Sequence, residues 1–245
     1  MNYRYFIVLL IILIYGCDSA NAPDCLQKAG RTTEVVLNVD PFNLLEVNSG
    51  LNVILEQGTE QLVTLNAGEN LISDIHYEVS GNQLLIRNDN SCNWVRPYDF
   101  PIVKIIHPNI SEIRLAGSGL ISSSGTLNFP RLILISEDES GDFKLDLNCA
   151  SLSIVSNDIT NYYMSGTVEN LKVMFASGDG RLEGNNLQVA NANIFHRGTN
   201  DIIVYVTDEL SGRIISTGDL IYVKTKPTVI DVSLENLGDL IDETE

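Results

Sequence analysis

The residues of this sequence that could do chemistry are the Ser, Gly and Asp of a short recurring motif. Its fullest copy is ESGD at residues 139–142, and its relatives are ASGDG at 176–180, STGDL at 216–220 and NLGDL at 236–240. A carboxylate beside a hydroxyl in a glycine-containing loop could bind a metal ion or transfer a proton. Because the motif returns along the chain, however, it favours the turn of a repeated structural unit over a catalytic loop.

The other titratable residues form no catalytic or metal-binding set. His76, His107 and His196 are scattered, and the sequence has no C-x-x-C pair, the spacing typical of zinc sites. His196, in FHRGTND, is expected on the surface beside a turn. A glycan-cleaving enzyme needs carboxylates that converge on one cleft, whereas the Asp of this motif recurs with each turn. The sequence therefore predicts no enzyme, no cofactor and no metal site.

Calcium binding by the S-G-D turns is an open alternative. Calcium-binding loops of the repeat-in-toxin type have a nine-residue period with several Gly and Asp in each turn. The present motif supplies one Asp in about twenty residues, which argues against that kind of site.

The N-terminus predicts export and a lipid anchor. Arg4 precedes the uncharged apolar run YFIVLLIILIY at residues 5–15, which is too short for a comfortable membrane span and is typical of a signal peptide. The following IYGC resembles a bacterial lipobox, so that residues 1–16 are removed and Cys17 becomes the lipidated first residue. The expected location is the cell envelope, anchored in the outer membrane. An ordinary secretory signal in which the cysteine falls by chance is the alternative.

The charge balance excludes polyanionic partners. The chain has 15 Lys and Arg against 32 Asp and Glu. Removal of residues 1–16 leaves 14 against 32, a net charge of −18. Such a surface repels nucleic acid and anionic membranes, and its simplest role is to keep an exported protein soluble.

Three cysteines remain once Cys17 carries lipid. Disulfides are plausible in an exported protein. Cys25 and Cys92 lie in polar, turn-like surroundings, whereas Cys149 lies among apolar strand residues in DLNCASL. We therefore expect a Cys25–Cys92 disulfide that holds the N-terminal arm, with Cys149 free.

A period of about twenty residues runs through the second half of the chain. The first register is the central residue of each turn: Gly119, Gly141, Asn157, Gly178, Gly198, Gly218 and Gly238. The second is the first apolar residue of the strand before each turn: Leu132, Leu152, Leu171, Val189, Leu210 and Ile230. Two registers that agree are the signature of a repeat architecture, and twenty residues suffice for two or three short strands with corners.

The sequence thus predicts an all-β protein, a β-helix with about twenty residues per coil. Residues 17–34 are a polar tether and 35–245 a single β-solenoid domain, with an N-terminal part at 35–110 and regular repeats at 111–240. EVSGNQLLIRN at 78–88 reads as a hairpin that caps one end, while the acidic tail guards the other.

The turns and strands of each coil have separate expected roles. Columns such as Leu152/Ile154, Leu171/Val173/Phe175 and Ile230/Val232/Leu234 should point inward. The turn glycines, and Asn157 in their place, should supply positive φ. The motif carboxylates should form an exposed, solvated acidic edge, because a buried ladder of like charges would repel itself: Asp142, Asp158, Asp179, Asp219 and Asp239.

Several segments together resemble the auto-transporter adhesin, head GIN domain family of Bacteroidetes. They are the lipobox, DCLQKAG at 24–30, PFNLLEVNSGLNVILEQGTEQLVTLNAGENL at 41–71, LLIRNDNSCNW at 84–94 and the later turns of the GSGD type. The turns at Asn157 and Gly198 depart from the family pattern, which fits structural turns better than a shared catalytic site. The resemblance implies a right-handed parallel β-helix, an envelope location and an adhesive role.

The predicted function is a non-enzymatic, envelope-anchored β-solenoid lipoprotein: an adhesin or binding module for a glycan, a protein partner or another copy of itself. The alternative is a polysaccharide lyase or hydrolase, since parallel β-helices also carry such enzymes. Trp94, Tyr98 and Phe100, in NWVRPYDFP, are candidate binding aromatics that could stack on sugar rings. They could equally cap the open end of the apolar column.

Overall fold

The computed structural model describes residues 28–48, 50–90, 99–137 and 141–244. The strands in chain order are β1 (Thr32–Leu37), β2 (Leu44–Asn48), β3 (Asn52–Gln57), β4 (Leu62–Gly68), β5 (Ile75–Ser80), β6 (Gln83–Asn88), β7 (Ile102–His107), β8 (Glu112–Ala116), β9 (Leu120–Leu127), β10 (Arg131–Ser136), β11 (Asp142–Ser156), β12 (Asn161–Phe175), β13 (Arg181–His196), β14 (Ile202–Ile214), β15 (Leu220–Lys224), β16 (Val229–Leu234) and β17 (Leu240–Thr244). A short 3-10 helix, η2 (Ile72–Asp74), precedes β5. Within these residues no helix is long and apolar enough to cross a membrane.

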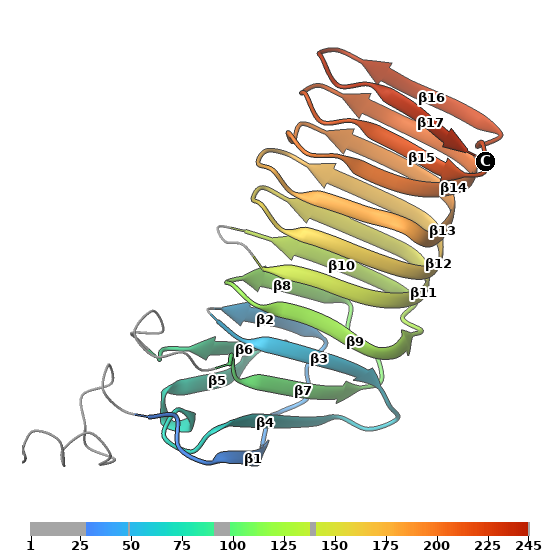
Figure 1. The fold of residues 1–245 in the computed structure, drawn as a ribbon. Helices are drawn as coiled ribbons and strands as arrows, with labels where there is room; N and C mark the ends of the chain where they lie inside the picture. The colour runs from blue at the N-terminus through green and yellow to red at the C-terminus, as the bar shows by residue number, and fades with distance from the viewer. Residues whose placement is uncertain (1–27, 49, 91–98, 138–140, 245) are drawn as a thin grey trace, which may run out of the picture.

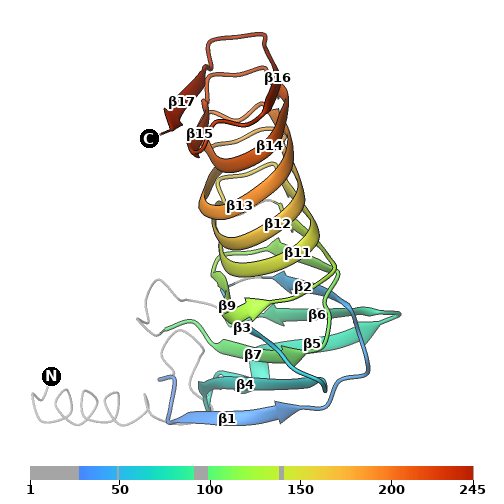
Figure 2. The same cartoon turned by 90° about the vertical axis from the view of Figure 1, so that its right-hand side faces the viewer.

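From β8 onward the chain winds as a parallel β-solenoid with one coil stacked on the next. In Figure 1 the coils rise from the N-terminal strands to β16 and β17, and Figure 2 shows them as a narrow column on a broader base. β11 pairs with β12 in parallel register from Asp142↔Asn161 to Ser156↔Phe175. Each coil therefore advances by about twenty residues, and the predicted all-β solenoid is confirmed.

The strand register agrees with the predicted period at all positions but one. Successive coils align Leu132, Leu152, Leu171, Ala192, Leu210 and Ile230. Val189, the residue expected in the fourth position, pairs instead with Val168 and Val206. The cause is that Ala192 is small and lies between two asparagines, so the sequence offers the larger Val189, three positions earlier, as the first apolar residue.

Inward side chains form the predicted apolar columns along the solenoid. Leu152, Ile154, Val173 and Phe175 are each at most 1% exposed. The ring of Tyr162 is stacked on Phe143 with centroids 5.3 Å apart. Full burial of such a side chain contributes about 1.5–3 kcal/mol, and an aromatic pair adds about 0.5–1.5 kcal/mol, so this column is a major source of stability.

A polar network lies at the turn end of the same column. Tyr162 Oη is 2.6 Å from Ser136 Oγ, and the hydroxyls of Ser136 and Ser156 each donate to Asp158 Oδ1 at 2.9 Å. The backbone N–H of Thr160 donates to the same oxygen at 3.0 Å. The expectation that every motif carboxylate lies on an exposed edge is therefore wrong for Asp158, because its half-buried carboxylate joins buried hydroxyls of two coils.

The N-terminal strands are not stacked in chain order. The β2–β3 unit pairs on one side with β6 and β7 and on the other with β8 and β9, all in parallel. β1 is antiparallel to β4 and β4 to β7, which covers this end of the column. The predicted hairpin is confirmed as β5 and β6, joined at Gly81 with φ +63°.

The C-terminal coil is the last of the column, and its strand β17 carries the charged residue Asp242. Its inward positions are only partly covered, and Leu234 is 49% exposed. On β17, Asp242 stands next to inward-facing Tyr222. Hydrogen bonds from the Thr244 hydroxyl, Tyr222 and the Thr244 N–H lower the pKa of Asp242 to about 2. An ionised, exposed side chain at the register position next to buried Tyr222 discourages the addition of another coil.

The turn residues lie where the sequence places them, but their backbone conformation differs from the expectation. Only Gly119 (φ +132°) and Gly178 (φ +90°) among them have positive φ, and Asn157 does not. At Gly141, Gly218 and Gly238 the glycine instead leaves room for a neighbouring coil. A Cβ on Gly218 would lie 2.2 Å from the Asn200 carbonyl oxygen and 2.4 Å from His196 Nε2, whereas a Cβ on Gly198 would approach no atom closer than 3.3 Å.

Alanine substitution at two turn glycines without positive φ tests whether close approach explains the glycine. Gly218→Ala should lower the free energy of unfolding by about 2–3 kcal/mol, because the added methyl overlaps the preceding coil. Gly198→Ala, at the equivalent turn and also without positive φ, should cost less than about 1 kcal/mol. Urea unfolding followed by circular dichroism measures both, and equal costs would contradict the explanation by close approach.

Candidate functional site

Two irregularities shape the outer surface of the solenoid where β9, β11, β12 and β13 lie side by side. Three residues of β9, between Ser122 and Thr126, lie opposite the single β11 residue between Lys144 and Asp146. Two residues of β13, between Glu183 and Asn186, lie opposite the single β12 residue between Tyr163 and Ser165. β-Bulges re-aim side chains and bend a strand away from its neighbours, and here they raise a wall on either side of β11 and β12.

A groove of about 440 Å³ lies between these walls. Its floor consists of two outward-facing rows that cross three coils: Lys144, Tyr163 and Glu183, and Asp146, Ser165 and Asn186. Ser123 lines the groove on the β9 side and Asn185 on the β13 side. Five of the six side chains in these two rows are polar or charged, and the sixth is the aromatic ring of Tyr163, in the middle of the first row.

Hydrogen bonds fix the second row to the wall. The backbone N–H of Asp146 donates to Ser123 Oγ at 2.9 Å, and Ser165 Oγ donates to the Asp146 carboxylate at 3.2 Å. A side chain held by its neighbours loses less conformational entropy when a ligand arrives. The polar atoms of this row are therefore pre-organised.

Tyr163 is the free aromatic surface of the groove. Its residue is 44% exposed, and within the described part of the chain its hydroxyl has no hydrogen bond and its ring no aromatic or cationic contact. Tyr205, two coils further on, differs in this respect. Lys224 Nζ lies 5.1 Å above the Tyr205 ring and 3.3 Å from Asn186 Oδ1, so that ring is covered.

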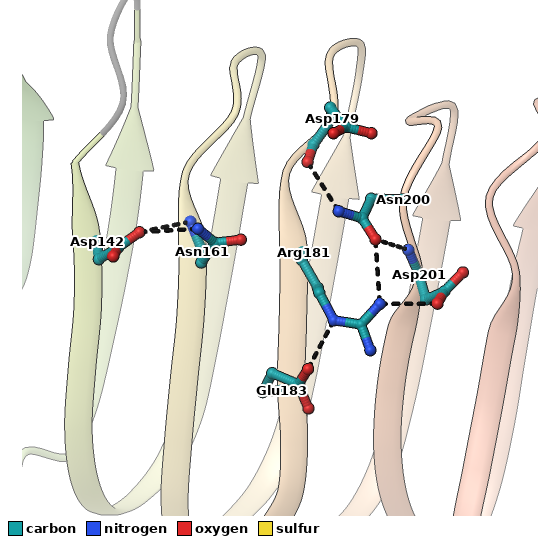
Figure 3. Close-up of polar contacts among 7 residues, drawn as sticks. All are labelled: Asp142, Asn161, Asp179, Arg181, Glu183, Asn200 and Asp201. Carbon is teal, nitrogen blue, oxygen red and sulfur yellow. Dashed lines mark hydrogen bonds and ion pairs between the residues drawn. The ribbon is translucent and has the colours of Figure 1, made fainter.

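The turn edge, where the S-G-D motif lies, is cross-linked between coils (Figure 3). Asp142 Oδ1 accepts from the backbone N–H of Asn161 at 3.2 Å and from its side chain at 3.0 Å. Arg181 pairs with Glu183 at 2.6 Å and with Asp201 at 2.7 Å. The hydrogen bond with Glu183 is the main cause of the raised pKa of Arg181.

The predicted ladder of like charges is thus only partly present. Asp239 does follow Asp219, and its backbone N–H donates to the Asp219 carboxylate at 2.8 Å. In the middle coils, amide, hydroxyl and guanidinium groups alternate with the carboxylates. Asp179, for example, accepts from Thr199 Oγ1 at 2.7 Å. These contacts give the motif a structural role. Among the described residues there is no group of three or more His, Cys, Asp or Glu suited to hold a metal ion.

His196 is not the surface residue that its polar neighbours in the sequence suggested. It is fully buried, edge-on to Phe175 with ring centroids 6.1 Å apart. Its Nδ1 accepts from the Gly198 N–H at 3.3 Å, and its buried Nε2 has no partner among the described residues. Burial lowers the pKa of His196, as it does that of His107, because desolvation disfavours the charged imidazolium.

The candidate residues taken from the sequence lie apart from the groove or outside the described residues. Cys17, Cys25, Cys92, Trp94 and Tyr98 are all outside them. Phe100 is described: it is half-buried, and its ring would lie 3.3 Å from a Cβ on Gly50, in the N-terminal part of the fold.

Cys149 is free and buried, as expected. Burial raises the pKa of its thiol to about 11. Because the thiolate is the reactive form of cysteine, this residue is not a nucleophile at neutral pH.

Comparison with known sequences identifies the family. Residues 41–226 match the family described as "Putative auto-transporter adhesin, head GIN domain". The chain belongs to this family. The resemblance predicted from the lipobox, the N-terminal segments and the GSGD-type turns is thereby confirmed, and the solenoid is the fold of a head GIN domain. No curated protein matches the chain.

Solved structures share the head GIN fold. A "putative adhesin" from Bacteroides fragilis NCTC 9343 has a TM-score of 0.77 at 20% identity, over 86% of this chain and 97% of that chain. A "putative lipid binding protein" from Parabacteroides distasonis ATCC 8503 has a TM-score of 0.61 at 18% identity, over 86% and 97%. At these identities the likeness concerns the fold alone.

The buried histidines predict a loss of stability in mild acid. Since the unfolded chain binds a proton on His196 near pH 6.5 and the folded chain binds it only at lower pH, stability is complete above pH 6.5. It should fall as the pH drops toward 5, by up to about 1.4 kcal/mol per pH unit for one proton. Urea unfolding between pH 7.5 and 5.0 measures this slope.

Two histidine variants test which histidine causes the change of stability with pH. His196→Leu should reduce it by about half, because His107 contributes the remainder. His76→Gln is the matched control, since the His76 side chain is 56% exposed and stays in water in the folded chain. An unchanged slope in His196→Leu would contradict the assignment.

Proposed function

We propose that this head GIN domain is an exported, lipid-anchored binding module of the cell envelope. It holds a glycan or a protein partner on the outside of the solenoid without transforming it. The family description supports adhesion, and long solenoid faces suit extended ligands. The acidic surface, with a net charge of −17 over the full sequence, disfavours nucleic acid.

The groove over β11 and β12 is the observation that carries this proposal. Its two carboxylates are engaged by neighbours: Glu183 is ion-paired with Arg181 at 2.6 Å, and Asp146 accepts a hydrogen bond from Ser165. A glycan-cleaving enzyme needs one carboxyl group kept protonated by its surroundings and a second one facing it across the bond. An arrangement of ion-paired and hydrogen-bonded carboxylates suits recognition rather than acid catalysis.

The anchor in this proposal is the lipid on Cys17, after removal of residues 1–16. In this proposal the tether runs from Cys17 to residue 31, shorter than the predicted 17–34 because β1 already begins at Thr32, and β1 lies at the base of the column in Figure 2. The solenoid would then point away from the outer membrane and present its sides to the surroundings.

Loss of the lipid site should release the protein. In a bacterial host with lipoprotein processing, the wild type should incorporate radiolabelled palmitate and sediment with membranes. Cys17→Ser should do neither, because the thiol is the acceptor of the lipid. The matched control is Cys149→Ser, whose buried thiol should leave both properties unchanged. Membrane-bound, labelled Cys17→Ser protein would contradict the anchor.

Binding without turnover should distinguish this role from that of an enzyme. Incubation of the purified protein with plant and host polysaccharides should release no reducing ends and no unsaturated products. Colorimetric assay of the supernatant and its absorbance at 235 nm measure the two classes of product. Time-dependent release of either product would favour the alternative, a polysaccharide hydrolase or lyase.

A further inference from the structure

We propose that the groove over β11 and β12 is a binding site for an uncharged glycan chain, with the ring of Tyr163 as its stacking platform. This inference rests on the proposed binding function and names the class of ligand. It is carried by one exposed aromatic ring, by the polar groups around it and by the size of the groove.

The ring of Tyr163 offers the apolar contact that a sugar requires. The C–H faces of a pyranose pack on an aromatic ring, and an amphipathic residue such as Tyr combines such a face with a polar tip. Tyr163 is 44% exposed, although a large aromatic side chain without a partner is costly to leave in water. Its neighbours in the row, Lys144 and Glu183, leave the ring between two polar side chains.

The polar groups around the ring match a polyhydroxyl ligand. Asp146 and Ser165 supply oxygens held in place by hydrogen bonds, and Asn185 on the wall is exposed. A carboxylate accepts two hydrogen bonds, while an amide donates and accepts. Adjacent hydroxyl groups of a sugar can satisfy both kinds of group at once.

The balance of charged side chains in the groove favours an uncharged ligand over an anionic one. Two of its side chains are acidic, Asp146 and Glu183, and one is basic, Lys144. Elsewhere on the solenoid, Arg181 and Arg213 pair with carboxylates of the next coil, whereas Lys144 has no ion pair within the described residues. A groove with one ammonium and two carboxylates does not favour a uronic acid or a phosphate, but the Lys144 ammonium can donate to a hydroxyl.

The dimensions favour a short stretch of glycan over a folded protein. A volume of about 440 Å³ lies in the range of about 300–1,000 Å³ that is typical of small-ligand sites. A stable protein interface needs about 800 Å² and 20–30 residues on each partner, whereas ten residues line this groove.

A second groove, on the hairpin of β5 and β6, is the rival site. It has about 490 Å³ and contains Tyr77, which is 40% exposed. Two of its three charged lining side chains are occupied, however, because Asp89 pairs with Arg87 at 2.7 Å and with His76 at 3.5 Å, which leaves Glu78. The groove over β11 and β12 therefore has more groups available to a ligand.

The test compares single substitutions in the two grooves. The full chain, purified in a mild detergent, is applied to an array of uncharged and acidic glycans. The best uncharged oligosaccharide is then titrated by isothermal calorimetry. Tyr163→Ala should weaken its binding at least tenfold, Tyr163→Phe should stay within threefold because the ring remains, and Tyr77→Ala should have no effect. Thermal unfolding of each variant confirms that it is folded, which is expected for surface substitutions.

Each other outcome overturns the inference. It is wrong if no uncharged glycan binds, if only acidic glycans bind, if a protein is the sole ligand, or if Tyr77→Ala rather than Tyr163→Ala abolishes binding. In these cases the proposed binding function itself can still hold. Release of reducing ends or unsaturated products from the titrated oligosaccharide would instead overturn the proposed function, so the two failures are distinguishable in one experiment.

Discussion

The parallel hydrogen-bond ladder between coils is the constraint on which the rest of this structure depends. It places each residue about 4.8 Å from its equivalent in the next coil, so whatever occurs at a position must tolerate a copy or a partner directly above it. Apolar residues meet this demand by forming columns, as Phe143, Tyr162 and Phe175 do. Glycines meet it by leaving room for the neighbouring carbonyl, as Gly218 and Gly238 do. Charged residues meet it by alternating with opposite or neutral groups, as around Arg181.

The same constraint explains why the sequence predicts so much of the fold. Apolar residues that recur every twenty positions can be counted without a structure, and Leu152, Leu171 and Leu210 lie where the count places them. Val189 was misplaced because Ala192, the residue aligned with Leu171, is small, and Val189 is the nearest larger apolar residue before it. His196 was misplaced because its polar neighbours suggested a surface, whereas the alternation at the end of β13 turns its ring inward. The position of β2–β3 between β6–β7 and β8–β9 was beyond prediction, since pairing between distant segments leaves no local signal.

The candidate site was harder to predict than the fold for a related reason. In the sequence, the aromatic residues near Trp94 are the candidates for ligand binding because they cluster in a loop. The groove depends instead on Tyr163, an isolated outward position in a regular strand, and on bulges that raise its walls. One signal was available. In NYYMSG the inward column takes Tyr162, so alternation leaves the second tyrosine in solvent, where an aromatic residue calls for an explanation. A bulge is defined by how one strand pairs with its neighbour, and the sequence of a single strand does not show that pairing.

The position of β2–β3 between later strands also constrains how the chain can be assembled. A solenoid whose coils stack in chain order can grow one coil at a time from its first strand, as repeat proteins do. Here the β2–β3 unit acquires its neighbour on one side only when β6 and β7 are available, and on the other only when β8 and β9 follow. A chain that emerges from a membrane with its N-terminus first therefore reaches about residue 127, the end of β9, before this unit is enclosed. Once the N-terminal strands have paired with one another, each further coil can fold on the edge of a coil that is already formed.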